Sequence, residues 1–178
     1  QLNSSGGWNN VSKQKIAAGY KFAFDNPLNT KATGISAVLT LTTDKKSGSY
    51  SWHVDVNNKS KDLTITQVTD GQISLRKFAD KCDILVPTMS GYLEKDALKK
   101  NGSLSGSSMQ FYAQFSQSDR PFGFYFGMHD PKAESRNMAV YTDAASRTAR
   151  YSDTVIVPNQ VPGNSYIQSG ADVWKALQ

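Results

Sequence analysis

The residues that could perform acid–base, nucleophilic or metal chemistry in this sequence are few and scattered. There are two histidines, His53 and His129, and one cysteine, Cys82. Neither histidine belongs to an HxH or HxxxH pair or lies near the cysteine, and zinc sites usually need such spacing. The acidic stretches lack the regular oxygen ligands of a calcium loop. The sequence therefore predicts no metal site and no cofactor.

Motifs for covalent or phosphoryl chemistry are also missing from the sequence. No GxSxG, Walker or GxGxxG pattern occurs. Cys82 adjoins apolar residues in FADKCDILVP, which favours a small buried side chain over a nucleophile. We predict that the chain is not an enzyme. A small hydrolase stays open as an alternative, because the paired carboxylates of a glycosidase are close only in space.

The stretch RPFGFYFGMHDPK, residues 120–132, carries the strongest candidate for a binding surface. We predict that Tyr112 and Tyr125 share one face of a hairpin, with Gly123 and Gly127 leaving room around Tyr125. A flat aromatic face beside small residues suits sugar rings or lipid headgroups, and equally a second sheet packed upon it. The candidate ligand-binding residues are Tyr112, Tyr125, His129, Lys132 and Arg136.

Alternating apolar residues predict the strands that position these side chains. Residues 35–43 and 50–56 alternate and predict one hairpin, and residues 103–115 and 122–128 predict a second. In the second hairpin, Phe122, Phe124, Phe126 and Met128 are expected to face the core. Asp70-Gly71 lies between two alternating runs and predicts a type I′ hairpin turn. Further strands are predicted over residues 15–24, 82–87, 138–143 and 153–158.

Eight to ten short strands with frequent turns and almost no helix are typical of an all-β fold. We predict a single antiparallel β-sandwich domain over residues 1–178. Residues 1–14 are polar and glycine-rich and are expected to form an N-terminal arm. Residues 165–178 are expected to form a C-terminal tail or short helix, because Ile167, Val173, Trp174 and Leu177 fit one helical side.

The charge of the chain argues against nucleic acid as a partner. The net charge is +5, but basic residues occur in pairs at most, whereas nucleic-acid binders concentrate them. A mild attraction to anionic lipid or glycan surfaces is compatible with this charge. No apolar run approaches the length of a membrane span. Four Asn-X-Ser triplets, at Asn3, Asn10, Asn58 and Asn101, are compatible with a secreted protein.

The order of segments resembles that of the actinoporin and aegerolysin cytolysins. YSWHVDVNNKSKDLTI precedes GSSMQFYAQF and then FGFYFGMHDPKAESRNMAVY, and the resemblance covers about residues 50–143. It implies a compact β-sandwich that binds membrane lipids. The loop HDPKAESRN differs from the aromatic lipid-binding loops of those proteins. Residues 1–19 also lack the apolar content of a helix that enters a bilayer.

Three functions follow from these observations. The first is a secreted, non-enzymatic β-sandwich that binds a membrane lipid or glycan. A pore-forming cytolysin is one protein of this kind. The second is a self-assembling subunit of a viral coat or filament, in which the termini reach neighbouring copies. The third is the small hydrolase. The expected location is extracellular, or the virion under the second alternative, and a homo-oligomer is an expected partner state.

Overall fold

Two antiparallel sheets make up the protein in a computed structural model that describes residues 2–76, 81–88, 90–106, 111–116 and 123–177. In these residues the larger sheet has the order β1 (Trp8–Ile16), β2 (Gly19–Pro27), β3 (Ile35–Asp44), β4 (Ser49–Asn58), β14 (Ala171–Leu177), β10 (Gly123–His129), β9 (Phe111–Ser116), β6 (Cys82–Val86) and β7 (Tyr92–Glu94), and β13 (Tyr166–Ile167) pairs with β4. The smaller sheet has the order β5 (Gln67–Arg76), β12 (Thr148–Ile156), β11 (Arg136–Asp143) and β8 (Gly102–Gly106). The described residues also form two 3-10 turns outside the sheets, η1 (Thr30–Ala32) and η2 (Ala97–Lys99). The predicted all-β fold is confirmed.

The core lies between the smaller sheet and the β6–β9–β10–β14 part of the larger one. Phe124, Phe126 and Met128 of β10 face this core, as predicted, whereas Phe122 lies outside the described residues. Phe126 packs against Trp52 with ring centroids 5.8 Å apart and against Tyr151 at 5.7 Å. Interlocked aromatic rings from both sheets therefore hold the sandwich together.

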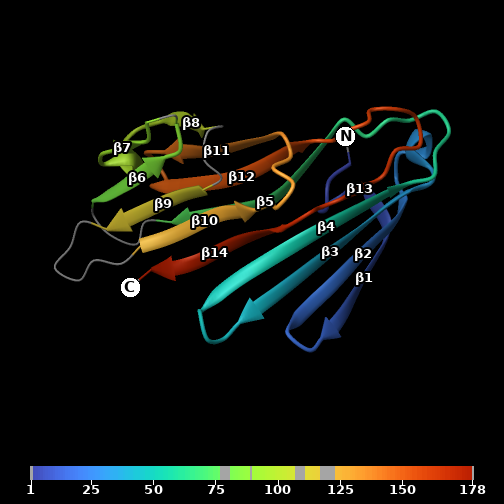
Figure 1. Cartoon of the computed structure of the whole chain (residues 1–178), viewed down its shortest axis with the longest axis horizontal. Helices are drawn as coiled ribbons and strands as arrows, with labels where there is room; N and C mark the ends of the chain where they lie inside the picture. The colour runs from blue at the N-terminus through green and yellow to red at the C-terminus, as the bar shows by residue number, and fades with distance from the viewer. Residues whose placement is uncertain (1, 77–80, 89, 107–110, 117–122, 178) are drawn as a thin grey trace.

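Strands β1 to β4 extend beyond the smaller sheet as a splayed, twisted ribbon (Figure 1). Most side chains of β1 are exposed, and the apolar residues of β3 are only half-buried along its length. No second layer formed by the residues that the structure describes therefore covers the face of β1 to β4 that continues the core. Among the described residues, neither short helix could cross a membrane.

The two terminal predictions are wrong. Residues 8–16 form the edge strand β1, paired along its length with β2, and do not form an arm. Residues 171–177 form β14, which lies between β4 and β10, and do not form a helix. The spacing of apolar residues in so short a stretch fits both structures, and the ladder on both sides of β14 favours the strand.

The strand count is also higher than predicted, because β1, β7 (Tyr92–Glu94), β13 and β14 were not expected and the run at 103–115 divides between sheets. Residues 102–106 form β8 beside β11, and residues 111–116 form β9 beside β10. The β3–β4 hairpin and the pairing of β9 with β10 are confirmed. The structure thus has fourteen strands in its described residues instead of eight to ten.

The Asp70-Gly71 turn prediction is wrong in a different way. Strand β5 continues through both residues, and Gly71 has a φ of +60°. The register with β12 shifts at this point, where Tyr151 pairs with Ile73 but Asp153 pairs with Asp70. The dipeptide therefore forms a β-bulge with glycine in the left-handed region. A type I′ turn needs a positive φ at both residues, but only Gly71 has one, and the bulge uses it there.

Candidate functional site

Aromatic side chains gather on the uncovered continuation of the core face. We call this set, Tyr20 and Phe22 of β2, Tyr50 of β4 and Trp174 of β14, the aromatic face. Tyr50 and Trp174 are register partners, and their rings stack with centroids 4.0 Å apart at an interplanar angle of 8°. Tyr20 and Tyr50 are each 37% exposed. Trp174 also lies 5.9 Å from the ring of Phe124, so the face is anchored to the core.

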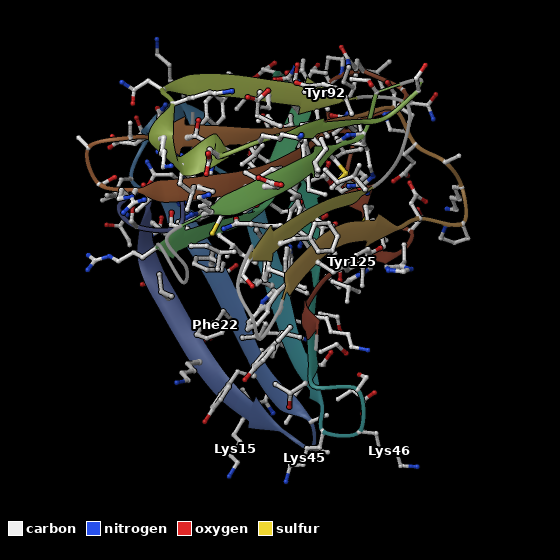
Figure 2. All side chains as sticks on the ribbon, turned by 90° about the vertical axis from the view of Figure 1, so that its left-hand side faces the viewer. Lys15, Phe22, Lys45, Lys46, Tyr92 and Tyr125 are labelled. Atoms are coloured by element: carbon white, nitrogen blue, oxygen red, sulfur yellow. The ribbon has the colours of Figure 1, made fainter. Side chains whose placement is uncertain are left out.

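Lysines of the edge strand β1 lie at the border of the aromatic face. The Nζ of Lys13 lies 4.1 Å from the ring centroid of Tyr20 and 5.8 Å from that of Phe22. Figure 2 shows Lys15, Lys45 and Lys46 at the free end of the extension, with Phe22 farther along the ribbon. The surface thus combines flat apolar rings with ammonium groups that donate hydrogen bonds. The sequence analysis missed this site, because its rings come from strands far apart in the chain.

Tyr112 and Tyr125 do not share a face, so this prediction is wrong. Tyr112 lies opposite Phe126 and is fully buried, whereas Tyr125 lies opposite Ala113. Directly opposed residues of an antiparallel pair point to the same side of a sheet. A register displaced by one residue therefore puts the two tyrosines on opposite sides. The hydroxyl of Tyr112 lies 2.9 Å from the carbonyl oxygens of Leu104 and Met138, inside the core.

Tyr125, His129 and Lys132 remain close to the surface. The Tyr125 hydroxyl lies 3.2 Å from Nε2 of His129, and the side chain extends over Gly127, where a Cβ atom would overlap it. Gly127 therefore gives Tyr125 room, as predicted. Burial raises the pKa of Tyr125. Ligand binding by Tyr125, His129 and Lys132 stays a prediction.

Arg136 is an interior residue that closes an ion network. Its side chain is 4% exposed, and the guanidinium lies 3.4 Å from Asp130 and 3.5 Å from Glu134. It also donates to Asp153 and, at 3.1 Å, to the hydroxyl of Tyr166. Burial opposes its charge, but the pKa of Arg136 is raised by acidic groups around it, namely Asp153, Tyr166, Asp172 and Asp70. The guanidinium is fully engaged by protein groups, which leaves it no role at a surface.

The loop after β10 is organised around the carboxylate of Asp130. Burial tends to raise the pKa of this group, but the Ser169 hydroxyl, the amides of Glu134 and Lys132 and the charge of Arg136 hold the pKa below its usual value. The amides donate at 2.8 Å each. The histidine–aspartate pair of the sequence is therefore a structured turn whose aspartate faces the interior.

Three buried carboxylates, Asp70, Asp153 and Asp172, have oxygens within 4.8 Å of one another. Burial and then the charge of Asp153 raise the pKa of Asp70 to about 7. Burial followed by the charge of Asp70 raises the pKa of Asp172. The sequence analysis missed this cluster because its members are far apart in the chain. The sequence did contain one indication of it. Asp153 occupies the same side of its strand as Tyr151 and Val155, which both face inward.

The raised pKa of Asp70 predicts how stability changes with pH when a chelator removes cations. The groups that face Asp70 are Asp153, Asp172 and Arg136. The folded protein keeps a proton that the unfolded chain releases near pH 4, so the free energy of unfolding should fall as pH rises to about 7. We expect a loss of up to about 4 kcal/mol in urea unfolding. Asp70→Asn should flatten this dependence, and a wild-type stability that rises over the same range would contradict the prediction.

Two shallow surface hollows lie away from the aromatic face. One, of about 250 Å³, is lined by β3, β4 and residues near Ser165. The other, of about 270 Å³, lies on the outer side of the smaller sheet and includes Tyr141 and Arg150. The Arg150 guanidinium carbon lies 5.3 Å from the ring centroid of Tyr141, which is 44% exposed. Tyr141 is thus an exposed tyrosine that can serve as a control for the aromatic face.

Comparison with known proteins gives solved structures only. No family model matches the chain, and no curated protein does. The GalNAc complex of an α-N-acetylgalactosaminidase from Bifidobacterium bifidum matches 97% of this chain with a TM-score of 0.68 and 10% identity. The α-galactosidases from Geobacillus stearothermophilus and Lactobacillus brevis match 94% and 96% of it, with TM-scores of 0.58 and 0.59 and identities of 13% and 14%.

These similarities concern the fold. This chain corresponds to 28%, 27% and 25% of the three glycosidase chains, so it spans about a quarter of their length. The same two-sheet architecture is therefore present within larger glycosidases.

Proposed function

We propose that this chain is a non-catalytic β-sandwich domain that binds glycan on its aromatic face and accompanies glycosidase activity. Support comes from the solved structures, which are glycosidases and contain this fold over about a quarter of their length. The observation that carries the binding part is the stacked pair of Tyr50 and Trp174 on an uncovered sheet surface. This proposal takes the glycan branch of the function predicted from the sequence.

The chemistry of the aromatic face suits pyranose rings. One side of such a ring presents C–H groups that pack on an aromatic plane, while its hydroxyls need polar partners. The rings of Tyr50 and Trp174 are nearly parallel with centroids 4.0 Å apart, so Trp174 supports one face of Tyr50, which is 37% exposed, and holds its ring in a fixed orientation. Lys13 lies beside Tyr20 and offers hydrogen-bond donors at the border. Both requirements of a sugar ring are thus met on one surface.

The positions of the carboxylates support a non-catalytic role. A glycosidase needs two carboxyl groups on either side of the bond to be cleaved, in a site open to substrate. Among the described residues, Asp70, Asp153 and Asp172 form a close set, but all three are buried between the sheets. They cannot flank a glycosidic bond in this arrangement.

Glycan arrays followed by calorimetry test the proposal. The similar glycosidases form complexes with GalNAc and raffinose, which suggests probes with terminal galactose or GalNAc and free raffinose. We expect binding, and we expect Trp174→Ala and Tyr50→Ala each to lower the affinity about ten-fold or more by removing one ring of the stack. Tyr141→Ala is the matched control, since it removes an exposed tyrosine from the other sheet.

Two results would contradict the proposal. One is the absence of binding to every glycan on the array, and the other is equal loss of affinity in Trp174→Ala and Tyr141→Ala. Binding to glycan-free liposomes alone would instead favour the lipid branch. Lipid binding, pore formation, self-assembly and secretion remain predictions from the sequence.

A further inference from the structure

The buried carboxylates join the two sheets at the β5 bulge. Asp70 of β5 and Asp153 of β12 belong to the smaller sheet and are register partners. Asp172 of β14 comes from the larger sheet, where it lies opposite Trp52 of β4. Asp153 and Asp172 are fully buried, and Asp70 is 8% exposed. A group that bound all three would therefore link both layers from inside the core.

The oxygens of this cluster lack donors. Apart from the contact between the Asp70 and Asp172 carboxyl groups themselves, Oδ1 and Oδ2 of Asp70, Oδ1 of Asp153 and Oδ2 of Asp172 have no hydrogen-bond partner among the described residues. The other oxygens are satisfied, since Arg136 donates to Asp153 and Gln168 donates to Oδ1 of Asp172 at 3.2 Å. Buried acceptors without donors are costly and call for an occupant. Four carboxylate oxygens are thus without a hydrogen-bond partner, and one oxygen from each of the three aspartates lies within 4.8 Å of the others.

Trp52 gives a second and independent indication of an occupant. Only 5% of Trp52 is exposed, yet its indole N–H has no acceptor among the described residues. The place that a Cβ on Gly71 would take lies 2.6 Å from Cε2 of Trp52, the atom bonded to Nε1, and 2.5 Å from Oδ2 of Asp172. The indole ring that carries the unsatisfied donor and one of the unsatisfied acceptors, Oδ2 of Asp172, therefore both lie beside Gly71. A cation with a bound water satisfies both, because the water oxygen coordinates the cation and accepts the indole N–H.

The charges of the cluster point in the same direction. Three carboxylates face one guanidinium, and Arg136 also serves Asp130 and Glu134. An excess of negative charge without a counter-ion is unfavourable in a buried site. When ionised, the three aspartates alone carry two more negative charges than Arg136 offsets, which is the charge of a divalent cation, and the ion pairs of Arg136 with Asp130 and Glu134 add to this excess. The all-oxygen donor set suits calcium rather than zinc, which prefers nitrogen and sulfur ligands.

We propose that Asp70, Asp153 and Asp172 bind one divalent cation of the calcium type, which joins the two sheets beneath the β5 bulge. Calcium–oxygen distances of about 2.4 Å allow ligands on opposite sides of the ion to be about 4.8 Å apart. The three carboxylates meet this limit, since their oxygens lie within 4.8 Å of one another. The cation then replaces a proton between the close carboxyl groups of Asp70 and Asp172. This site is separate from the aromatic face and does not depend on glycan binding.

Thermal unfolding of the whole chain in calcium and in EDTA at pH 7.5 tests the proposal. We expect a melting temperature higher by about 5 °C or more in millimolar calcium, because a ligand of the native state stabilises it. Asp172→Asn keeps the shape of the side chain but removes one charged ligand, so it should abolish most of the shift. Asp25→Asn is the control, since Asp25 is exposed on β2 and distant in sequence from the cluster. An unchanged wild-type melting temperature, or an equal shift in Asp172→Asn, would overturn the proposal.

Terbium luminescence gives a readout that does not require a ligand variant to fold. Terbium occupies calcium sites and emits when an excited tryptophan lies close by. We expect one equivalent to emit, calcium to displace it, and Trp52→Phe to lose most of the emission. Trp8→Phe is the matched control, because Trp8 packs on Phe24 with ring centroids 5.9 Å apart, in the β1–β2 region. Absence of sensitised emission in the wild type, or equal emission from both variants, would count against the site.

Discussion

Replacing Arg136 by methionine is expected to lower the free energy of unfolding by about 3–5 kcal/mol. Methionine fills much of the same space, so the loss comes from the carboxylates that are left behind. Arg136 donates to Asp153 and lies 3.4 Å from Asp130 and 3.9 Å from Asp172, and these side chains are fully buried. Urea unfolding in EDTA at pH 7.5, followed by tryptophan fluorescence, measures the change.

Two further variants show whether charge or the shape of the guanidinium matters. Arg136→Lys keeps the positive charge but lacks the planar fork, so we expect an intermediate loss of about 1–3 kcal/mol. Arg150→Met removes an exposed arginine that lies over Tyr141, and it should cost less than about 1 kcal/mol. Equal stability of Arg136→Met and Arg150→Met would contradict the network described for Arg136.

Many of the strands were predictable, because the alternation of apolar and polar residues that specifies a strand is a local pattern. Alternation over residues 35–43 and 50–56 specifies a strand with two unlike faces, and the β3–β4 hairpin follows that alternation. The inward faces of Phe124, Phe126 and Met128 follow from the same rule. Local periodicity thus predicts which side chains of one strand share a side.

The partition of strands between sheets was not predictable in this way. Register between distant strands depends on contacts that the local sequence does not contain. The register of β9 against β10 is displaced by one residue from the one expected, which puts Tyr112 and Tyr125 on opposite sides of the sheet. The residues around the two tyrosines do not indicate this displacement. The place of β14 between β4 and β10 likewise depends on the ladders on both sides, because its own residues fit a helix equally well.

Both candidate sites are assembled across these long-range pairings. Tyr50 and Trp52 lie on β4, and Asp172 and Trp174 lie opposite them on β14. The pair Tyr50–Trp174 points to the uncovered aromatic face, while Trp52 and Asp172 border the buried carboxylates. Two residue pairs of one ladder, separated by the pair Ser51–Val173, thus serve a surface site and an interior site. A sequence motif could not reveal either site, because each needs residues from both ends of the chain.

Gly71→Ala is expected to lower the free energy of unfolding by about 3 kcal/mol, from two separable causes. The first is the backbone, since Gly71 has a φ of +60° and a side chain there costs about 1 kcal/mol. The second is overpacking of about 1–3 kcal/mol, because the new methyl group would overlap Cζ2 of Trp52 and approach Oδ2 of Asp172 to 2.5 Å. Trp52 cannot move away easily, as it is 5% exposed and packs on Phe126.

Gly48→Ala separates the two causes. Gly48 has a φ of +64° in the β3–β4 turn, and nothing lies within 4 Å of a Cβ placed there. Its variant should therefore show the backbone cost of about 1 kcal/mol without the overlap. The difference between the two glycine variants in urea unfolding measures how tightly Trp52 and Asp172 close over the bulge. If the two variants lose the same stability, the space above Gly71 is larger than the structure indicates, and the close approach of Trp52 to the carboxylates is wrong.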